Sequence, residues 1–267
     1  MHKSNFQLII LLFSLLVYGY FNLQSQNISP ISNKKIHQYI IENGMSLIGK
    51  PYKGGTLESE GPEKLTYFDD AFDCVTFVEY VLAKSKTQDI IDKENFESYL
   101  TKMRYRDGVI NGYGSRLHYF TEWILQNCTQ NNFQDITKSI GGIPYVKTIN
   151  FISRHKSKYA KLSVIEDLEK IKTSEKRLNN HKRYYIPKKT LTKVQHRILD
   201  GDVIAFTTSI SGLDVVHTGF AKWVKGKLCL LHASETEKKV VLTSLSLAEY
   251  IMRNQNQSGI IVVRCLK

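Results

Sequence analysis

The change in hydrophobic period along the chain constrains the fold more than any other feature. Apolar residues recur at helical spacing over residues 36–47, 72–84, 95–103 and 117–127. After Gly141 the pattern shortens into β-rich runs, punctuated by Gly, Ser and Asp, at residues 202–206, 215–224, 227–232, 240–242 and 260–263. Helices followed by antiparallel strands predict an α+β fold, with ample length for one hydrophobic core.

The first 26 residues combine a basic start with an apolar run, which is typical of a secretory signal peptide. We therefore expect residues 1–26 to be a cleaved signal and residues 27–267 to form a single exported domain in the periplasm or cell envelope. An uncleaved membrane anchor is the alternative, although the apolar stretch 6–23 falls just short of the ~20 residues that a helix needs to span a bilayer. After cleavage, no stable membrane span is predicted.

The chain carries 37 Lys and Arg against 25 Asp and Glu, a formal net charge of +12. This surplus suits an acidic partner such as a nucleic acid, an anionic lipid or a carboxylate-rich wall polymer. Export and the lack of a zinc-finger or RNP motif argue against nucleic acid. The excess positive charge gathers within residues 165–197, which we expect to be an insertion or a long irregular connection. This segment is either a solvated basic loop or a contact for the acidic partner.

Cys74 stands where the second helical pattern begins, and Asp73 before it is a plausible N-cap. A thiol in the first turn of a helix feels the partial positive charge of that helix end, so we expect a lowered pKa and a reactive thiolate. A buried structural cysteine on an apolar helix is the alternative. If Cys74 stays free, Cys128, Cys229 and Cys265 allow at most one disulfide.

Two histidines lie on neighbouring predicted strands. If Lys225-Gly226 forms a two-residue hairpin turn, Gly219 faces His232, and His217 becomes a diagonal neighbour of His232 on the same sheet face. A one-residue bulge at Gly226 would reverse this placement. A cysteine with two histidines suits a nucleophile, its base and the group that orients the base. The same atoms could hold zinc, although no fourth ligand stands at close spacing.

Five short motifs occur in an order that resembles the NlpC-type papain-like cell-wall hydrolases: residues 49–55, 72–74, 201–206, 217–220 and 231–233. Residues 113–120 and 212–217 resemble more narrowly the N-acetylmuramoyl-L-alanine amidase-like branch, long catalogued as a domain of unknown function. The resemblance extends from about residue 36 to the C-terminus. It departs from the common pattern at Val75-Thr76, where the superfamily usually has Ser-Gly.

The resemblance implies a papain-like fold, in which a helical N-terminal half carries the nucleophile helix and packs on an antiparallel C-terminal sheet or barrel. It implies a cysteine-dependent amide hydrolase acting on peptidoglycan or muropeptides, with no cofactor or metal. Cys74 would be the nucleophile, His217 the base and then the acid, and His232 the residue that orients His217. Tyr52 would flank the nucleophile and help to hold the oxyanion. The expected bond is N-acetylmuramoyl-L-alanine; a stem-peptide endopeptidase and a non-catalytic wall-binding module are the alternatives.

Four further residues are candidate substrate-binding groups. Arg116 offers a planar fork for a carboxylate, and Ser115 and His118 add hydrogen-bonding groups. A structural ion pair for Arg116 and helix packing for His118 are equally open. Asp214 could orient the base or bind a substrate ammonium, or it could simply occupy a turn.

Overall fold

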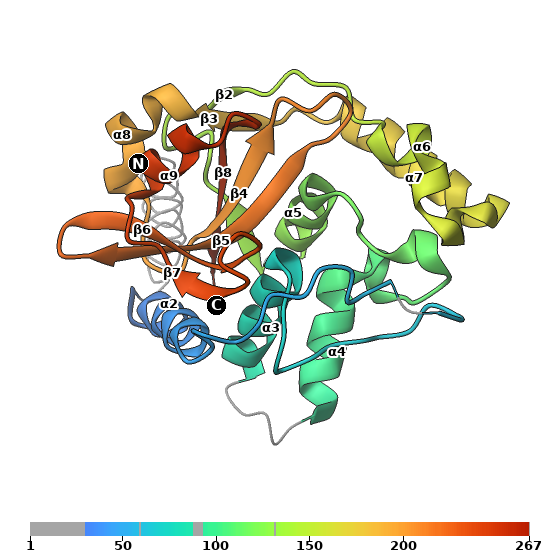
Figure 1. Ribbon diagram of the computed structural model, residues 1–267, viewed down its shortest axis with the longest axis horizontal. Coiled ribbons are helices and arrows are strands. Elements are labelled where there is room, and N and C mark those ends of the chain that lie inside the picture. Colours follow the sequence, from blue (N-terminus) through green and yellow to red (C-terminus); the bar gives the residue numbers. More distant parts are fainter. Residues whose placement is uncertain (1–29, 59, 88–92, 131, 267) are drawn as a thin grey trace, which may run out of the picture. The chain divides into compact units, whose positions relative to one another are not determined.

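The computed structural model describes residues 30–58, 60–87, 93–130 and 132–266 (Figure 1). Residues 35–267 make up one compact unit. The predicted signal peptide, residues 1–26, lies outside the described residues. Among the helices that are described, none has the length and apolar character needed to cross a bilayer.

Four longer helices occupy the N-terminal half, as the hydrophobic period predicts: α2 (Pro30–Met45), α3 (Cys74–Thr87), α4 (Lys93–Arg104) and α5 (Phe120–Thr129). The later helices are α6 (Phe151–Arg154), α7 (Ile165–Asn180), α8 (Leu191–Val194) and α9 (Leu247–Arg253). The 3-10 turns are η1 (Arg106–Gly108), η2 (Tyr113–Ser115), η3 (Lys156–Lys158), η4 (Ala160–Ser163), η5 (Lys188–Thr190) and η6 (Gln195–Arg197). The sequence did not predict α7 or α9.

Strands of the C-terminal half form an antiparallel sheet in the order β2-β3-β8-β4-β5-β6-β7, and β1 also pairs with β8. Their bounds are β1 (Phe133–Asp135), β2 (Ile143–Pro144), β3 (Tyr184–Pro187), β4 (Val203–Thr208), β5 (Val215–Val224), β6 (Lys227–Ser234), β7 (Lys239–Leu242) and β8 (Gln257–Cys265). Helices combined with an antiparallel sheet confirm the α+β class.

The basic segment 165–197 is regular, so the expectation of a long irregular connection is wrong. The segment contains the 16-residue helix α7, and β3 follows it. In β3, Ile186 pairs with Ile260 of β8, which ties the segment into the sheet. Ile171 and Leu178 of α7 are buried in a hydrophobic cluster, and this packing explains why the segment forms a regular helix.

The β5–β6 hairpin has the predicted register. Val224 pairs with Lys227, and Phe220 pairs with Leu231, which leaves Gly219 opposite His232. The turn residues Lys225 and Gly226 have φ angles of 48° and 79°. Positive φ at both central positions is the type I′ geometry whose twist matches that of the flanking strands. The alternative of a bulge at Gly226, which would have placed the two histidines on opposite faces, is therefore excluded.

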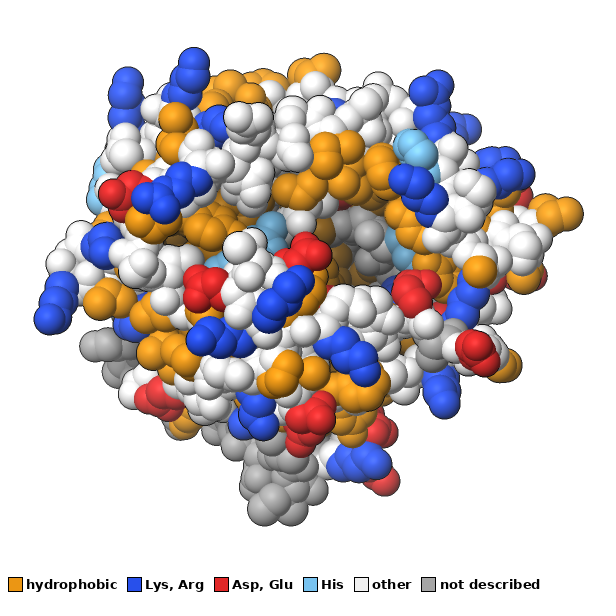
Figure 2. Space-filling view, in the orientation of Figure 1, with side chains coloured by type: hydrophobic (Ala, Val, Ile, Leu, Met, Phe, Trp, Pro, Cys, Tyr) orange, Lys and Arg blue, Asp and Glu red, His pale blue; other side chains and the backbone are white. Residues whose placement is uncertain are grey.

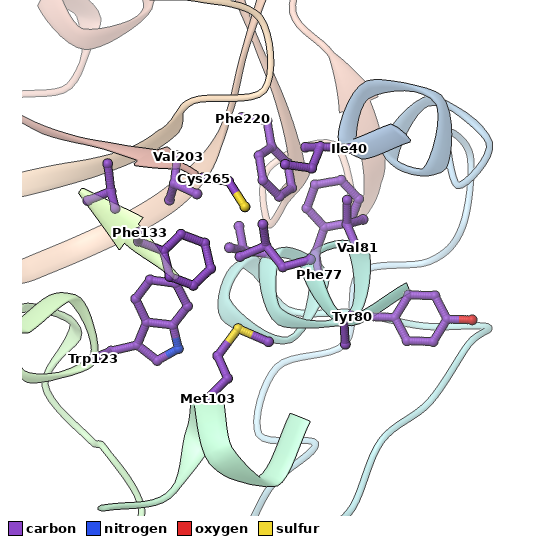
Figure 3. Close-up of a cluster of buried hydrophobic side chains, with 14 of the residues drawn as sticks. Ile40, Phe77, Tyr80, Val81, Met103, Trp123, Phe133, Val203, Phe220 and Cys265 are labelled. Carbon is purple, nitrogen blue, oxygen red and sulfur yellow. The ribbon is translucent and has the colours of Figure 1, made fainter. Parts of the chain in front are cut away.

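Two hydrophobic clusters lie on the two faces of the sheet because side chains alternate along each strand. Val203 and Ala205 of β4 pack with α2 to α5, whereas Ile204 and Phe206 pack with α8 and α9. The helix α3 meets the sheet through Phe77, whose ring lies 5.8 Å from that of Phe220 (Figure 3). This contact fixes α3, and with it the residue that begins the helix, against β5.

Candidate functional site

Cys74 is the first residue of α3, and its position is set by the cap before it. The carboxylate of Asp73 accepts hydrogen bonds from the backbone N–H groups of Val75 and Thr76, at 3.0 and 2.8 Å. The hydroxyl of Thr76 accepts one in return from the backbone N–H of Asp73, at 2.9 Å. These bonds satisfy amide groups that a helix start leaves unpaired, and they confirm Asp73 as the N-cap.

The predicted lowering of the Cys74 pKa is wrong for the free protein. Burial raises the pKa of the Cys74 thiol to about 12, and the negative charge of Asp73 adds to the rise. Backbone N–H groups of Thr218, Cys74 and Val75 favour the thiolate and pull the pKa down, but they do not outweigh burial. The thiol is therefore neutral at pH 7, and a role as nucleophile would require a base to take its proton.

The two histidines meet directly, as the register requires. His217 Nε2 lies 2.6 Å from His232 Nδ1, and the two rings stand edge to face with centroids 4.8 Å apart. Gly219 makes room for this pair, because a Cβ there would come within 2.8 Å of the His232 Cβ. The pair lies on the sheet face that α9 covers, since His217 is opposite Phe206 on β4.

Burial keeps both imidazoles neutral at pH 7. It lowers the pKa of His217 to about 4. It also lowers the pKa of His232 to about 3, and the neighbouring His217 contributes to that shift. For His217 Nδ1 to accept a proton, Nε2 must carry the hydrogen and donate it to His232 Nδ1. The hydrogen of His232 is then on its own Nε2, a buried atom without a hydrogen-bond partner among the described residues.

Thr218 and Tyr250 lie near both the thiol and the histidines, and Tyr52 lies near the thiol. The thiol lies beside the backbone N–H of Thr218, the residue that follows His217. Burial, and next the charge of Cys74, raise the pKa of Tyr52 to about 12, so its hydroxyl stays protonated close to the thiol. Burial, and next the charge of Cys74, also raise the pKa of the Tyr250 hydroxyl to about 12.

Tyr250 is a site residue that the sequence analysis missed. Its ring lies 5.3 Å from that of His232 and 6.4 Å from that of His217. It belongs to α9, which begins with a capping box between Ser246 and Glu249. That Ser-x-x-Glu signature could have revealed the helix. The return of α9 over the histidine pair depends on tertiary packing, which has no local signal.

The candidate residues 115, 116 and 118 lie close to Tyr113 along the chain. Arg116 makes the ion pair of its structural alternative, whereas the helix packing offered for His118 is wrong, because residue 118 lies between η2 and α5. Arg116 is 5% exposed, and its guanidinium lies over the Tyr113 ring. Its Nη2 lies 2.7 Å from the carboxylate of Glu58, and its Nη1 donates a hydrogen bond to the backbone carbonyl of Leu57. Ser115 bonds within its own turn. Recognition of a substrate carboxylate by Arg116 would require Glu58 to move away, and it stays a prediction.

His118 packs on the same ring. Its Nε2 lies 2.8 Å from the carbonyl oxygen of Tyr113, and the two rings are 4.4 Å apart. Burial, reinforced by the charge of Arg116, lowers the pKa of His118 to about 3. His118 is therefore a neutral imidazole at pH 7. Its substrate-binding role stays a prediction.

Asp214 is 1% exposed and fastens the start of α5 to the start of β5. Its Oδ2 accepts from both the backbone N–H and the hydroxyl of Thr121, each at 2.8 Å. The hydroxyl of Tyr145 donates to the Asp214 carbonyl at 3.1 Å. Because Thr121 binds the carboxylate and Tyr145 binds the backbone carbonyl, Asp214 positions the chain that leads into His217. Contact with a substrate ammonium stays a prediction.

Figure 2 shows a hollow near the middle of one face, with histidine side chains visible at its rim.

Across residues 30–58, 60–87, 93–130 and 132–266, no three His, Cys, Asp or Glu side chains converge in the way a metal ion needs. All four cysteines are free thiols. Cys74 begins a helix and lies beside the backbone N–H of Thr218, the residue after His217, and His217 contacts His232. A thiol and a pair of hydrogen-bonded imidazoles are groups that acyl transfer through a covalent intermediate uses.

The chain belongs to the AmiA-like family, described as N-acetylmuramoyl-L-alanine amidase-like, whose family model matches residues 42–260. That range includes Cys74, His217 and His232. An N-acetylmuramoyl-L-alanine amidase from Bacteroides uniformis is similar in structure, with 39% identity, a TM-score of 0.83, and coverage of 87% of this chain and 99% of that one.

Two other solved structures resemble this chain. A Bacteroides fragilis protein provisionally named a xylanase is 37% identical, with a TM-score of 0.78 and coverage of 84% of this chain and 99% of that one. A Legionella pneumophila protein shares the fold at 23% identity, with a TM-score of 0.68 and coverage of 87% and 89%. No curated protein matches the chain.

Proposed function

We propose that this protein is a cysteine-dependent amide hydrolase that cleaves the N-acetylmuramoyl-L-alanine bond of peptidoglycan or its muropeptide fragments. The observation that carries the proposal is the 2.6 Å contact between His217 and His232, together with a helix-start thiol beside the backbone N–H of Thr218, in a chain of the amidase-like family. The 39%-identical relative from Bacteroides uniformis is named for this activity.

In the first step, Cys74 Sγ attacks the amide carbonyl while its proton passes to His217 Nδ1, the nitrogen left free by the bond to His232. Concerted transfer fits two groups that are both neutral at rest. The backbone N–H of Cys74 and the protonated hydroxyl of Tyr52 are the proposed donors to the oxyanion.

When the tetrahedral intermediate collapses, the carbon–nitrogen bond breaks and His217 gives its proton to the departing amine. The muramoyl group remains on Cys74 as a thioester, and the stem peptide leaves. Water, deprotonated by the same imidazole, then hydrolyses the thioester. Throughout, His232 Nδ1 accepts the Nε2 hydrogen of His217, and this bond becomes charge-assisted whenever His217 is an imidazolium.

A glycosidase, as the xylanase name of one relative would suggest, needs two carboxyl groups about 5–9.5 Å apart on either side of the scissile bond. Here the chemistry centres on a thiol and two imidazoles. The adjacent carboxylate, Asp73, is held by the N–H groups of Val75 and Thr76. We therefore propose amide rather than glycosidic cleavage.

Within this proposal the fold is papain-like and of the NlpC type. The supporting features are the proposed nucleophile at the start of α3, the proposed base His217 on β5 and its partner His232 on β6. We also propose that residues 1–26 direct export, so that the enzyme works in the periplasm or cell envelope where its polymer lies.

Mass spectrometry of the products from a defined muropeptide tests the proposal. Free stem peptide, absent with the Cys74→Ala variant, is the expected result. Fragments cut within the stem would indicate an endopeptidase, and binding without turnover would indicate a wall-binding module. Iodoacetamide should abolish turnover and EDTA should leave it unchanged; the reverse pattern would reject the thiol mechanism.

A further inference from the structure

A recess on the surface is lined by Tyr250, the residue whose ring lies against the histidine pair. It has a volume of about 410 Å³, and its walls include Ser234, Glu237, Tyr250, Arg253 and Asn254; we call it the Tyr250 cavity. Ser234 follows His232 by two residues on β6 and so points to the same face of the sheet. Tyr250 contacts the cavity on one side and both imidazoles on the other. A substrate held at Cys74 could therefore extend past Tyr250 into this space.

The cavity carries two opposite charges that do not neutralise each other. Glu237 and Arg253 are both exposed, and in the part of the chain that the structure describes neither takes part in an ion pair. The charge of Glu237 reaches Tyr250, where it contributes to the raised pKa of the phenol after burial and Cys74. The charge of Arg253 reaches Glu249, where it is the weakest of the influences that lower the carboxyl pKa.

Neutral polar side chains also line the cavity. Ser234 and Thr236 supply hydroxyls, and Asn254 supplies an amide. A carboxylate and a guanidinium on the walls of one cavity match a ligand that has an ammonium and a carboxylate on the same carbon. Such a ligand would place each of its charges against the opposite charge of the wall, with the polar groups binding what remains.

We propose that the Tyr250 cavity binds the zwitterionic end of an amino acid, with Glu237 contacting the ammonium and Arg253 the carboxylate. The inference rests on the proposed function and deepens it, because a stem peptide that contains a diamino acid carries such an end on its side chain. The cavity would then select substrates by a part of the stem that is remote from the bond being cut.

Kinetics with three muramoyl-peptides test this assignment: one with a free diamino-acid end, one N-acetylated there, and one amidated at the carboxylate of that end. The native enzyme should lose about tenfold in kcat/KM on acetylation or amidation, because a hydrogen bond to a charged group is lost. Glu237→Gln should lose about tenfold on the free substrate and become insensitive to acetylation. Arg253→Gln should become insensitive to amidation.

The matched control is Glu169→Gln, which removes an exposed carboxylate far along the chain on α7. It should discriminate among the three substrates as the native enzyme does. Equal kcat/KM on all three substrates by the native enzyme, or a uniform loss on all three in Glu237→Gln, would overturn the assignment.

Calorimetry with the stem peptides alone separates this inference from the proposed function. If no substrate is cleaved, the proposed function fails, yet the native protein should still bind the free stem peptide about tenfold more tightly than its N-acetylated form. Equal affinity for the two peptides would overturn the cavity assignment whatever the fate of the amidase proposal.

Discussion

Replacing His232 gives a quantitative test of how the site works. Its side chain is 1% exposed, and its Nδ1 faces His217 Nε2 at 2.6 Å. In His232→Asn the amide oxygen stands on Cγ, as Nδ1 does in histidine, so it can accept the same hydrogen. In His232→Leu the space is filled but no acceptor remains. The two variants therefore separate the hydrogen bond from the packing.

The size of the effect follows from the charge that His217 gains in the proposed mechanism. A hydrogen bond to a charged group contributes about 1.5–3 kcal/mol, against about 1 kcal/mol between neutral groups. Loss of about 2 kcal/mol of transition-state stabilisation lowers kcat about 30-fold. Because His232 does not touch substrate in this mechanism, KM should change little. His232→Asn should keep kcat within about threefold of the native value.

The assay is the initial rate of stem-peptide release from a defined muropeptide, with the melting temperature measured in parallel. A folded His232→Leu variant with native kcat would refute the role of His232. An Asn variant as slow as the Leu variant would refute the hydrogen-bond explanation. A rise in KM alone would mean that His232 acts on substrate binding and not on the base.

Three further outcomes follow from the structure. Burial lowers the pKa of His217 to about 4, against about 6.5 in the unfolded chain, so this residue alone should cost on the order of 3 kcal/mol of stability as the pH drops from 6.5 toward 4. The lowered pKa values of His232 and His118 add to the fall in the same direction. Urea midpoints at pH 7.5, 6 and 5 measure the loss, and a flat profile would contradict it. Asp73→Asn keeps an N-cap acceptor but removes the negative charge beside the thiol, so the pKa of Cys74 should fall. Alkylation of Cys74 by iodoacetamide at pH 8 should therefore be faster in this variant. An unchanged rate would show that the Asp73 charge does not reach the sulfur. Arg104→Met leaves Glu79 buried without the partner that it contacts at 2.7 Å, so the free energy of unfolding should fall by about 3–5 kcal/mol. Most of that loss should be regained when Glu79→Leu is added. Equal stability of the single and double variants would contradict this explanation.

The four helices of the N-terminal half and the histidine pair could be predicted because their signals are local. Apolar residues three and four apart identify α3, and alternation with a Lys225-Gly226 turn fixes the register of β5 against β6. Once that register is known, the contact of His217 with His232 follows from strand geometry alone.

Other parts of the site depend on contacts between distant segments. Arg116 pairs with Glu58 and Glu63, which lie 58 and 53 positions away in the sequence, and no sequence spacing predicts these pairs. Tyr250 reaches the imidazoles only because α9 folds back after β7. The pKa of Cys74 is set by burial among elements that come together in the folded protein, so the helix start alone gave the wrong direction.

The central claim is that Cys74 forms the covalent intermediate, and intact-protein mass spectrometry of an acid-quenched single turnover tests it most directly. The expected result is a thioester on Cys74 that carries the acyl part of the muramoyl sugar, with stem peptide released in equal amount. An acyl group on any other residue, or stem-peptide release by folded Cys74→Ala at the native rate, would contradict the mechanism.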